Sequence, residues 1–351
     1  MTNPNLPRYP RLHLGKNQLA PINQATDNLP QNSRLDLAKI SAWDQVKSNL
    51  SKLLKVTFIL LFVGGIAGLG VDLSKKYVKW QQMQKVNQAN DLLAQEKYAA
   101  AIAAYDQLLQ TNSEQAHLLW INRGYAWLGL NEYDQMQQSC STATVIKPQA
   151  SLAWNCHGEA LYRLGQNQQA LQAFNQGISI DPDNPTFWLN KSTILSELQQ
   201  YQKAIAASKK GSDLLLKNKS PDSYVKSQLA IAFNQQGQSW LKLKQNQQAL
   251  TAFKQALEYS SDYLPALQGS GIALYELGRY QNATSIFSQI LQQSEFKQLT
   301  DEQQAINWLY QGISLCETDQ INSASQAFEQ VLQLSKNPQY RQLAQAGCGI
   351  R

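Results

Sequence analysis

A pattern of large and small apolar residues returns about every 34 residues along most of this chain, and it limits the fold more than any other feature. Its clearest copy spans residues 151–184 and contains Trp154, Gly158, Leu161, Ala170, Phe174 and Pro182. A large residue four places before glycine lets two helices pack closely, and Pro182 ends the second helix because proline lacks a backbone N–H. One such helix pair cannot bury its own apolar face, so neighbouring copies must stack against it.

Further copies in the same frame form a series. The copies occupy residues 82–115, 117–150, 151–184, 185–218, 230–263, 264–297 and 305–338. Insertions at 217–227 and 298–304 either lengthen a helix hairpin or change the superhelix angle. The series resembles the tetratricopeptide repeat (TPR). This resemblance implies an all-α fold, a right-handed α-solenoid of about seven helix pairs over residues 82–338, closed by a capping helix at 339–351.

The region before the repeats is predicted to reach and cross a membrane. Residues 1–40 carry prolines among Asn, Gln and Ser, which is typical of a disordered tail. Residues 41–55 have the spacing of an amphipathic helix, which either lies on an anionic membrane surface or simply leads into the next segment. Residues 56–73 include the uncharged run VTFILLFVGGIAGLGV, which with its apolar flank reaches the roughly 20 residues that span a bilayer. A linker helix is expected at 74–81.

The apolar segment also leaves alternatives open. It could instead be a buried helix docked on the array of a soluble scaffold. Gly64 and Gly68 form a GxxxG pair that would allow a homodimer, or they merely fill a helix. Lysines flank both ends, so the orientation depends on the basic tail, which favours the non-cytoplasmic side for the repeats. The glutamine-rich composition resembles that of cyanobacterial proteins, so plasma and thylakoid membranes are both candidates.

Histidine and cysteine placement does not favour catalysis or metal binding. His157 takes a place where the repeat normally has leucine, which indicates a structural role, and Cys156 points about 100° away from it on a helix. The four cysteines lack CxxC or zinc-type spacing. Each is an ordinary buried residue or, if the repeats face an oxidising compartment, part of a Cys140–Cys156 or Cys316–Cys348 disulfide. We expect no enzyme activity, cofactor or metal.

Basic residues exceed acidic ones, with a formal charge of +6 and a pI near 9.0. No uninterrupted basic stripe and no nucleic-acid motif is found, which disfavours a nucleic-acid partner. A lysine cluster surrounds the first insertion and could meet an acidic partner or lipid headgroups, although a solvated patch explains it as well. It consists of Lys203, Lys209, Lys210, Lys217, Lys219 and Lys226.

The TPR resemblance implies a concave groove lined by the first helix of each repeat. Its positions that tend to touch ligand are Asn122, Tyr125, Asn155, Glu159, Tyr162, Arg163, Asn190, Glu197, Asn234, Gln238, Lys242, Tyr275 and Glu276. Amides can bond the backbone of an extended peptide, and tyrosines offer rigid area at small entropic cost. The subclass that clamps a C-terminal carboxylate is excluded, because Val86, Leu152 and Cys156 stand where its basic residues belong.

These features predict a non-enzymatic, membrane-anchored scaffold that binds a segment or helix of a protein partner in its groove. The analogy with the family extends this to the assembly of a membrane complex. The alternatives are a protein that binds lipid or an envelope polymer through the lysine cluster and groove aromatics, and a soluble TPR scaffold.

Overall fold

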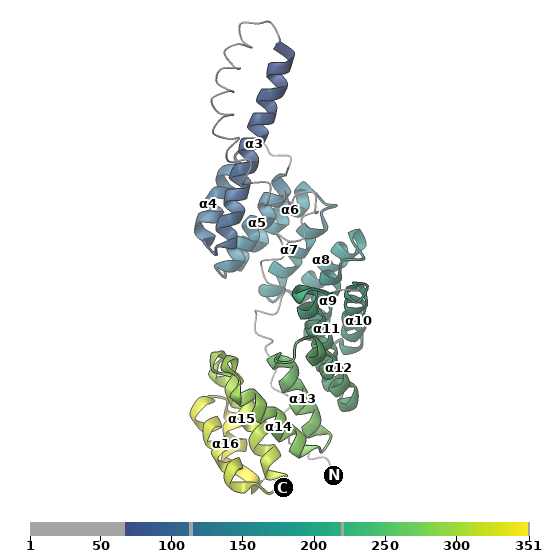
Figure 1. The fold of residues 1–351 in the computed structure, drawn as a ribbon, viewed down its shortest axis with the longest axis vertical. Helices are drawn as coiled ribbons and strands as arrows, with labels where there is room; N and C mark the ends of the chain where they lie inside the picture. The colour runs from purple at the N-terminus through teal and green to yellow at the C-terminus, as the bar shows by residue number, and fades with distance from the viewer. Residues whose placement is uncertain (1–66, 112–114, 219–220, 350–351) are drawn as a thin grey trace. The chain divides into compact units, whose positions relative to one another are not determined.

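The computed structural model describes residues 67–111, 115–218 and 221–349. Over these residues it contains fifteen α-helices, two short 3-10 helices and no strand, which confirms the predicted all-α class. The predicted tail at 1–40, the amphipathic helix at 41–55, and Gly64 lie outside the described residues. The described helices, most of which Figure 1 labels, divide between Gly165 and Gln166 into two compact units.

The first unit comprises the helices up to Gly165. They are α3 (Ala67–Ala94), α4 (Tyr98–Leu109), α5 (Ala116–Gly129), α6 (Tyr133–Ile146) and α7 (Ser151–Arg163). The last residues of the segment 56–73, the linker 74–81 and the start of the first repeat are one continuous helix, α3, with no proline to interrupt it. No helix in the described part of the chain is long and apolar enough to span a bilayer.

The second unit continues the alternation of first and second helices. Its helices are α8 (Asn167–Ile180), α9 (Pro185–Glu197), α10 (Tyr201–Leu215), α11 (Ser223–Lys242), α12 (Asn246–Tyr259), α13 (Leu264–Glu276), α14 (Tyr280–Gln292), η3 (Ser294–Gln298), α15 (Asp301–Cys316), α16 (Ile321–Leu334), α17 (Pro338–Ala346) and η4 (Gly347–Gly349). The first insertion lengthens α11 at its start. The second insertion, predicted at 298–304, follows η3 and forms the start of α15, which Thr300 caps with a capping box.

The same tight turn joins the two helices of every pair. One residue in each turn has a left-handed backbone, with φ between 57° and 75°: Glu96, Asn131, Gly165, Gln199, Lys244, Gly278 and Asp319. At Asn131 the turn closes with N–H groups of Asn131 and Glu132 donating to carbonyls of Leu128 and Trp127 at 2.9 and 3.0 Å. The carbonyl groups at the helix end are therefore satisfied.

The tryptophan of the repeat motif fixes the connection between successive pairs. Trp154 Nε1 donates to the carbonyl of Pro148, and Trp188 Nε1 donates to that of Pro182, both at 2.8 Å. The indole thus bonds the loop that precedes its own helix. This explains why a proline loop comes six residues before the tryptophan in both copies.

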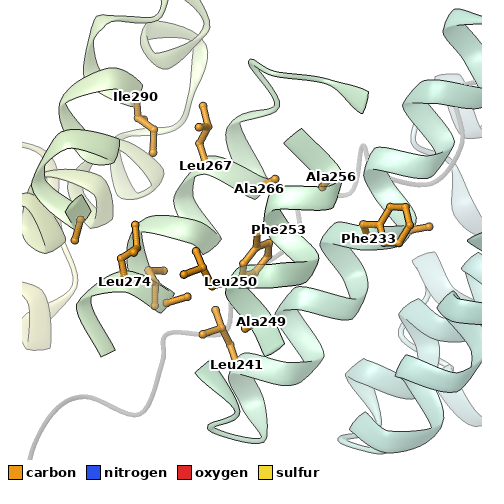
Figure 2. Close-up of a cluster of buried hydrophobic side chains, with 14 of the residues drawn as sticks. Phe233, Leu241, Ala249, Leu250, Phe253, Ala256, Ala266, Leu267, Leu274 and Ile290 are labelled. Atoms are coloured by element: carbon orange, nitrogen blue, oxygen red, sulfur yellow. The ribbon is translucent and has the colours of Figure 1, made fainter. Parts of the chain in front are cut away.

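Glycine and phenylalanine meet where helices of the second unit cross. A Cβ added to Gly237 or Gly269 would lie 2.6 or 2.3 Å from the Phe253 ring, so only glycine lets both helices approach that ring. Phe253 is fully buried and packs with Leu250, Leu267 and their neighbours in the core that Figure 2 shows. Burying such a ring stabilises the fold by roughly 1.5–3 kcal/mol.

At the corresponding helix crossing of the first unit, cysteine sulfur atoms fill the space that the Phe253 ring fills in the second. A Cβ on Gly124 would lie 2.6 Å from Cys140 Sγ and 3.0 Å from Cys156 Sγ. These cysteines form a disulfide between α6 and α7, with Cα atoms 5.4 Å apart. A second disulfide joins Cys316 on α15 to Cys348 in η4, with Cα atoms 5.3 Å apart. Both pairs that the sequence offered are therefore disulfides in the structure, and none of the four cysteines is free.

Candidate functional site

The first helices form one layer in each unit. In the first unit α3 contacts α5 and α5 contacts α7, and in the second α9, α11, α13 and α15 contact one another in succession. Within the described residues, no second helix makes comparable contacts with another second helix. The more closely spaced layer is the inner one of a stack of helix pairs, so its exposed face is where an extended ligand would lie.

Asn90 on α3 is the centre of a polar network in the first unit. Its Oδ1 accepts from the hydroxyl of Tyr105 at 2.8 Å and from Nδ2 of Asn122 at 3.0 Å. Burial raises the pKa of Tyr105, so its hydroxyl stays protonated and donates at neutral pH. The network joins α3, α4 and α5, and fixes the amide of the predicted residue Asn122.

A second polar network lies on α5 and α7. Asn155 Nδ2 donates to the hydroxyl oxygen of Tyr125 at 3.2 Å, and both residues are buried. One turn further, Arg163 Nη2 lies 3.4 Å from Glu159 Oε1, and both side chains are less than a tenth exposed. Burial raises the pKa of Glu159, while Arg163 opposes that rise. The structure brings these four predicted residues together, and the predicted Tyr162 is half-buried beside them.

The predicted residues of the second unit differ in exposure. Asn190 and Asn234 are buried, Gln238, Lys242 and Tyr275 are half-buried, and Glu197 and Glu276 are exposed. Burial lowers the pKa of Lys242, and the nearby Glu197 carboxylate raises it. The Oδ1 atom of Asn234 is buried without a hydrogen-bond partner.

Two hydrogen bonds that amide side chains make between first helices of the second unit were not predicted from the sequence. Gln235 Nε2 donates to Thr193 Oγ1 at 2.9 Å, and Gln268 Nε2 donates to Asn307 Oδ1 at 3.2 Å. A signal for them existed, because every first helix carries at least one amide residue. The series is Asn90, Asn122, Asn155, Asn190, Asn234, Gln268 and Asn307. Hydrogen bonds between neighbouring first helices therefore recur within each unit.

Aspartates partly neutralise the lysine cluster around the first insertion. Lys209 Nζ lies 3.2 Å from Asp213, and Lys217 Nζ lies 3.6 Å from Asp183. Lys203, Lys210 and Lys226 are exposed, and Lys219 lies outside the described residues. The surface attracts anions less than the lysines alone predict, because exposed ion pairs share the charge.

The described residues contain no group of three or more His, Cys, Asp or Glu side chains that could hold a metal ion. The histidines of the repeats are packing residues. His157 is half-buried beside Trp154, with ring centroids 6.3 Å apart, and burial lowers its pKa. His117 is buried at the start of α5, and burial and Lys147 lower its pKa.

Family models match three stretches of the chain. A TPR-repeat model matches residues 158–191, and a tetratricopeptide-repeat model matches residues 86–135 and 234–297. No curated protein matches the chain significantly.

Solved structures share the fold at low sequence identity. PilF of Pseudomonas aeruginosa is 17% identical, with a TM-score of 0.54 over 65% of this chain and 96% of its own. PilW, described as a widely conserved type IV pilus biogenesis factor, is 20% identical, with a TM-score of 0.56 over 66% and 99%. A TPR protein from Parabacteroides merdae is 13% identical, with a TM-score of 0.53 over 75% and 97%. The matched stretches are therefore TPR repeats, and the solved structures share the helical fold of this chain.

Proposed function

We propose that this chain is a non-enzymatic, membrane-anchored scaffold that holds an extended segment of a protein partner along its first-helix layer. The observation that carries the proposal is the series of amide side chains on that layer, one in every first helix, with tyrosines beside them. TPR folds generally serve as scaffolds for protein partners and not as enzymes.

Hydrogen-bond capacity on this layer suits a peptide backbone. Asn234 Oδ1 and Gln235 Oε1 are buried on α11 without partners, and Ser270 Oγ is buried without one on α13. A buried polar atom without a partner costs about 1–3 kcal/mol. Because these atoms lie below the surface, a bound segment would instead meet half-buried amides on the same helix, such as Gln238.

Membrane anchorage through residues 56–73 is the second part of the proposal. Its support in the described residues is the start of α3, where Tyr77 and Trp80 are about half exposed and their rings stack at 6.0 Å. Lys79 lies between them in the sequence, and Lys85 follows on the same helix. Tyrosine, tryptophan and lysine directly after an apolar segment are typical of the membrane–water interface. This arrangement favours an anchor over a soluble scaffold.

We further propose that the repeats lie on the non-cytoplasmic side of the membrane. Two disulfides support this location, because disulfides persist in oxidising compartments and are rare in the cytosol. There the scaffold would assist assembly of a membrane complex. The fold shared with pilus biogenesis proteins supports that role by analogy.

Photo-crosslinking in intact membranes tests the binding face. A photoreactive amino acid is placed at Tyr162 or Gln238 on first helices, and at exposed Gln176 or Lys254 on second helices as matched controls. The proposal expects a discrete protein adduct from the first-helix positions and none from the controls. Equal adducts from both faces would contradict it. Lipid adducts near Lys226 that disappear at high salt would favour the lipid-binding alternative.

Membrane extraction tests the anchor separately. The full-length chain should stay with the membrane in alkaline carbonate and leave it only in detergent. Release without detergent would overturn the anchor and favour the soluble scaffold, whatever the crosslinking result.

A further inference from the structure

Three tyrosines of the second unit meet where α13 ends. The Tyr275 ring on α13 lies 5.4 Å from Tyr280 at the start of α14 and 5.9 Å from Tyr310 on α15, measured between centroids. The Tyr275 and Tyr310 rings meet edge to face, at 77°. All three are half-buried, so each is packed yet keeps part of its ring open. Rings from three helices thus line one small surface.

The core holds this surface in place from behind. Tyr310 stacks on Phe287, with centroids 5.8 Å apart and ring planes at 17°, and Phe287 is fully buried. Phe287 in turn fills the crossing at Gly271, where an added Cβ would lie 2.7 Å from its ring. The aromatic surface is therefore preorganised and does not have to form when a ligand arrives.

Two carboxylates border the rings. Glu276 follows Tyr275 at the end of α13, and Glu317 follows α15; both are exposed. Burial is the main reason that the pKa of Tyr275 and of Tyr280 is raised, and the charges of Glu317 and Glu276 raise both further. The tyrosines therefore stay neutral, and the negative charge of this surface belongs to the two glutamates.

Elsewhere the chain places its own cations on its aromatic rings. The Arg123 guanidinium lies 5.2 Å from the Trp120 ring and 5.5 Å from Trp127, and Lys191 Nζ lies 5.3 Å from Trp188. Neither Glu276 nor Glu317 has an ion-pair partner among the described residues. The nearest basic residue in sequence, Arg279, donates instead to Gln247 at 3.5 Å.

We propose that this tyrosine–glutamate corner, formed by Tyr275, Tyr280, Tyr310, Glu276 and Glu317, binds a lysine or arginine side chain of the partner segment. Tyrosine faces attract a cation through the ring quadrupole, and the two carboxylates supply the opposite charge. The inference rests on the proposed function, because Tyr275, Glu276 and Tyr310 lie on the first helices α13 and α15, whose layer would hold the segment. It adds that the segment carries a basic residue where it passes α13 and α15.

Peptide binding to the full-length chain in detergent tests the corner. The probe is a fluorescein-labelled peptide of three Gly-Lys repeats, compared with the same peptide in which every lysine is acetylated, by fluorescence anisotropy. We expect the lysine peptide to bind and the acetylated peptide to bind at least about fivefold more weakly. The E276Q/E317Q variant should lose the same factor. The matched control E258Q/E329Q changes the net charge equally on second helices and should bind like the wild type.

The rings are tested at Tyr280. Y280F keeps the ring face and should keep the affinity, whereas Y280A should weaken it, with unchanged circular dichroism showing that both variants fold. The corner is wrong if the lysine peptide binds neither the full-length chain nor the chain without residues 1–40, or if both double variants weaken peptide binding equally. Binding that emerges only after deletion of residues 1–40 would assign the corner to the chain's own basic tail and overturn the partner as its occupant. First-helix crosslinks that persist in E276Q/E317Q, while this variant binds the lysine peptide normally, would refute the corner and leave the proposed function intact.

Discussion

The crossings at Gly124 and at Gly237 solve one packing problem in two ways. In the second unit the gap beside glycine is filled by the buried ring of Phe253, and in the first by the Cys140–Cys156 disulfide. Cys140 occupies the place in its repeat that other repeats give to Phe174, Phe253, Phe287 and Phe328. A disulfide thus fills the space that an aromatic ring fills elsewhere. The stability of the fold therefore depends on redox conditions at one crossing and on apolar burial at the other.

Removing the ring should have the largest effect. F253A leaves a cavity between two glycines, whose helices cannot close it without moving the backbone. The free energy of unfolding of the second unit should fall by about 3–5 kcal/mol. Denaturant titration followed by circular dichroism measures the loss. Exposed Lys254 is the adjacent control, and K254A should change the midpoint little; an equally small change in F253A would mean that the crossing can repack.

Removing the Cys140–Cys156 disulfide should have the second-largest effect on stability. The Cys140→Ala/Cys156→Ala variant opens a link across 16 residues, worth about 3 kcal/mol in the loop-entropy account. Hydrogen exchange read by mass spectrometry should show faster exchange in α6 and α7, both in this variant and in reduced wild type. The corresponding Cys316→Ala/Cys348→Ala variant should loosen only α15–α17 and η4.

A variant that replaces the disulfide with a phenylalanine ring tests whether the two crossings are interchangeable. Cys140→Phe/Cys156→Ala gives the first unit the ring that the other repeats use, and it should recover much of the stability while becoming insensitive to reductant. If it is less stable than the double alanine variant, the crossing at Gly124 is shaped for sulfur and cannot accept a ring.

Acidification should have the smallest effect and should act mainly on the first unit. The pKa of His157 is lowered by burial, so the unfolded chain takes up a proton near pH 6.5 that the folded chain resists. Stability present above that pH should therefore decline as the pH falls through it. H157L should flatten the decline, and His117, whose pKa is also lowered, should account for what remains. Melting temperatures between pH 7.5 and 5.5 check this; a parallel decline in H157L would exclude His157 as a source.

The period of the motif was enough to predict the all-helical fold, because the positions of Trp154, Gly158 and Phe174 fix which faces must pack. The network at Asn90 could not be predicted, since its donor Tyr105 comes from a second helix and only tertiary packing brings it there. The sequence leaves both disulfides as an alternative, because the spacing of cysteines does not show whether the repeats lie in an oxidising compartment. The cysteine at a phenylalanine position was the overlooked signal for Cys140.

The left-handed turns have a consequence for how this chain could be engineered. Three of them hold Glu96, Gln199 and Lys244 at a φ that costs such residues about 1 kcal/mol, whereas asparagine and aspartate tolerate it better and Gly165 and Gly278 adopt it freely. Glycine at Glu96, Gln199 or Lys244 would relieve that strain in the turns, without altering a helix face or a crossing. The thermal stability of the repeat array and its ligand specificity can thus be changed independently.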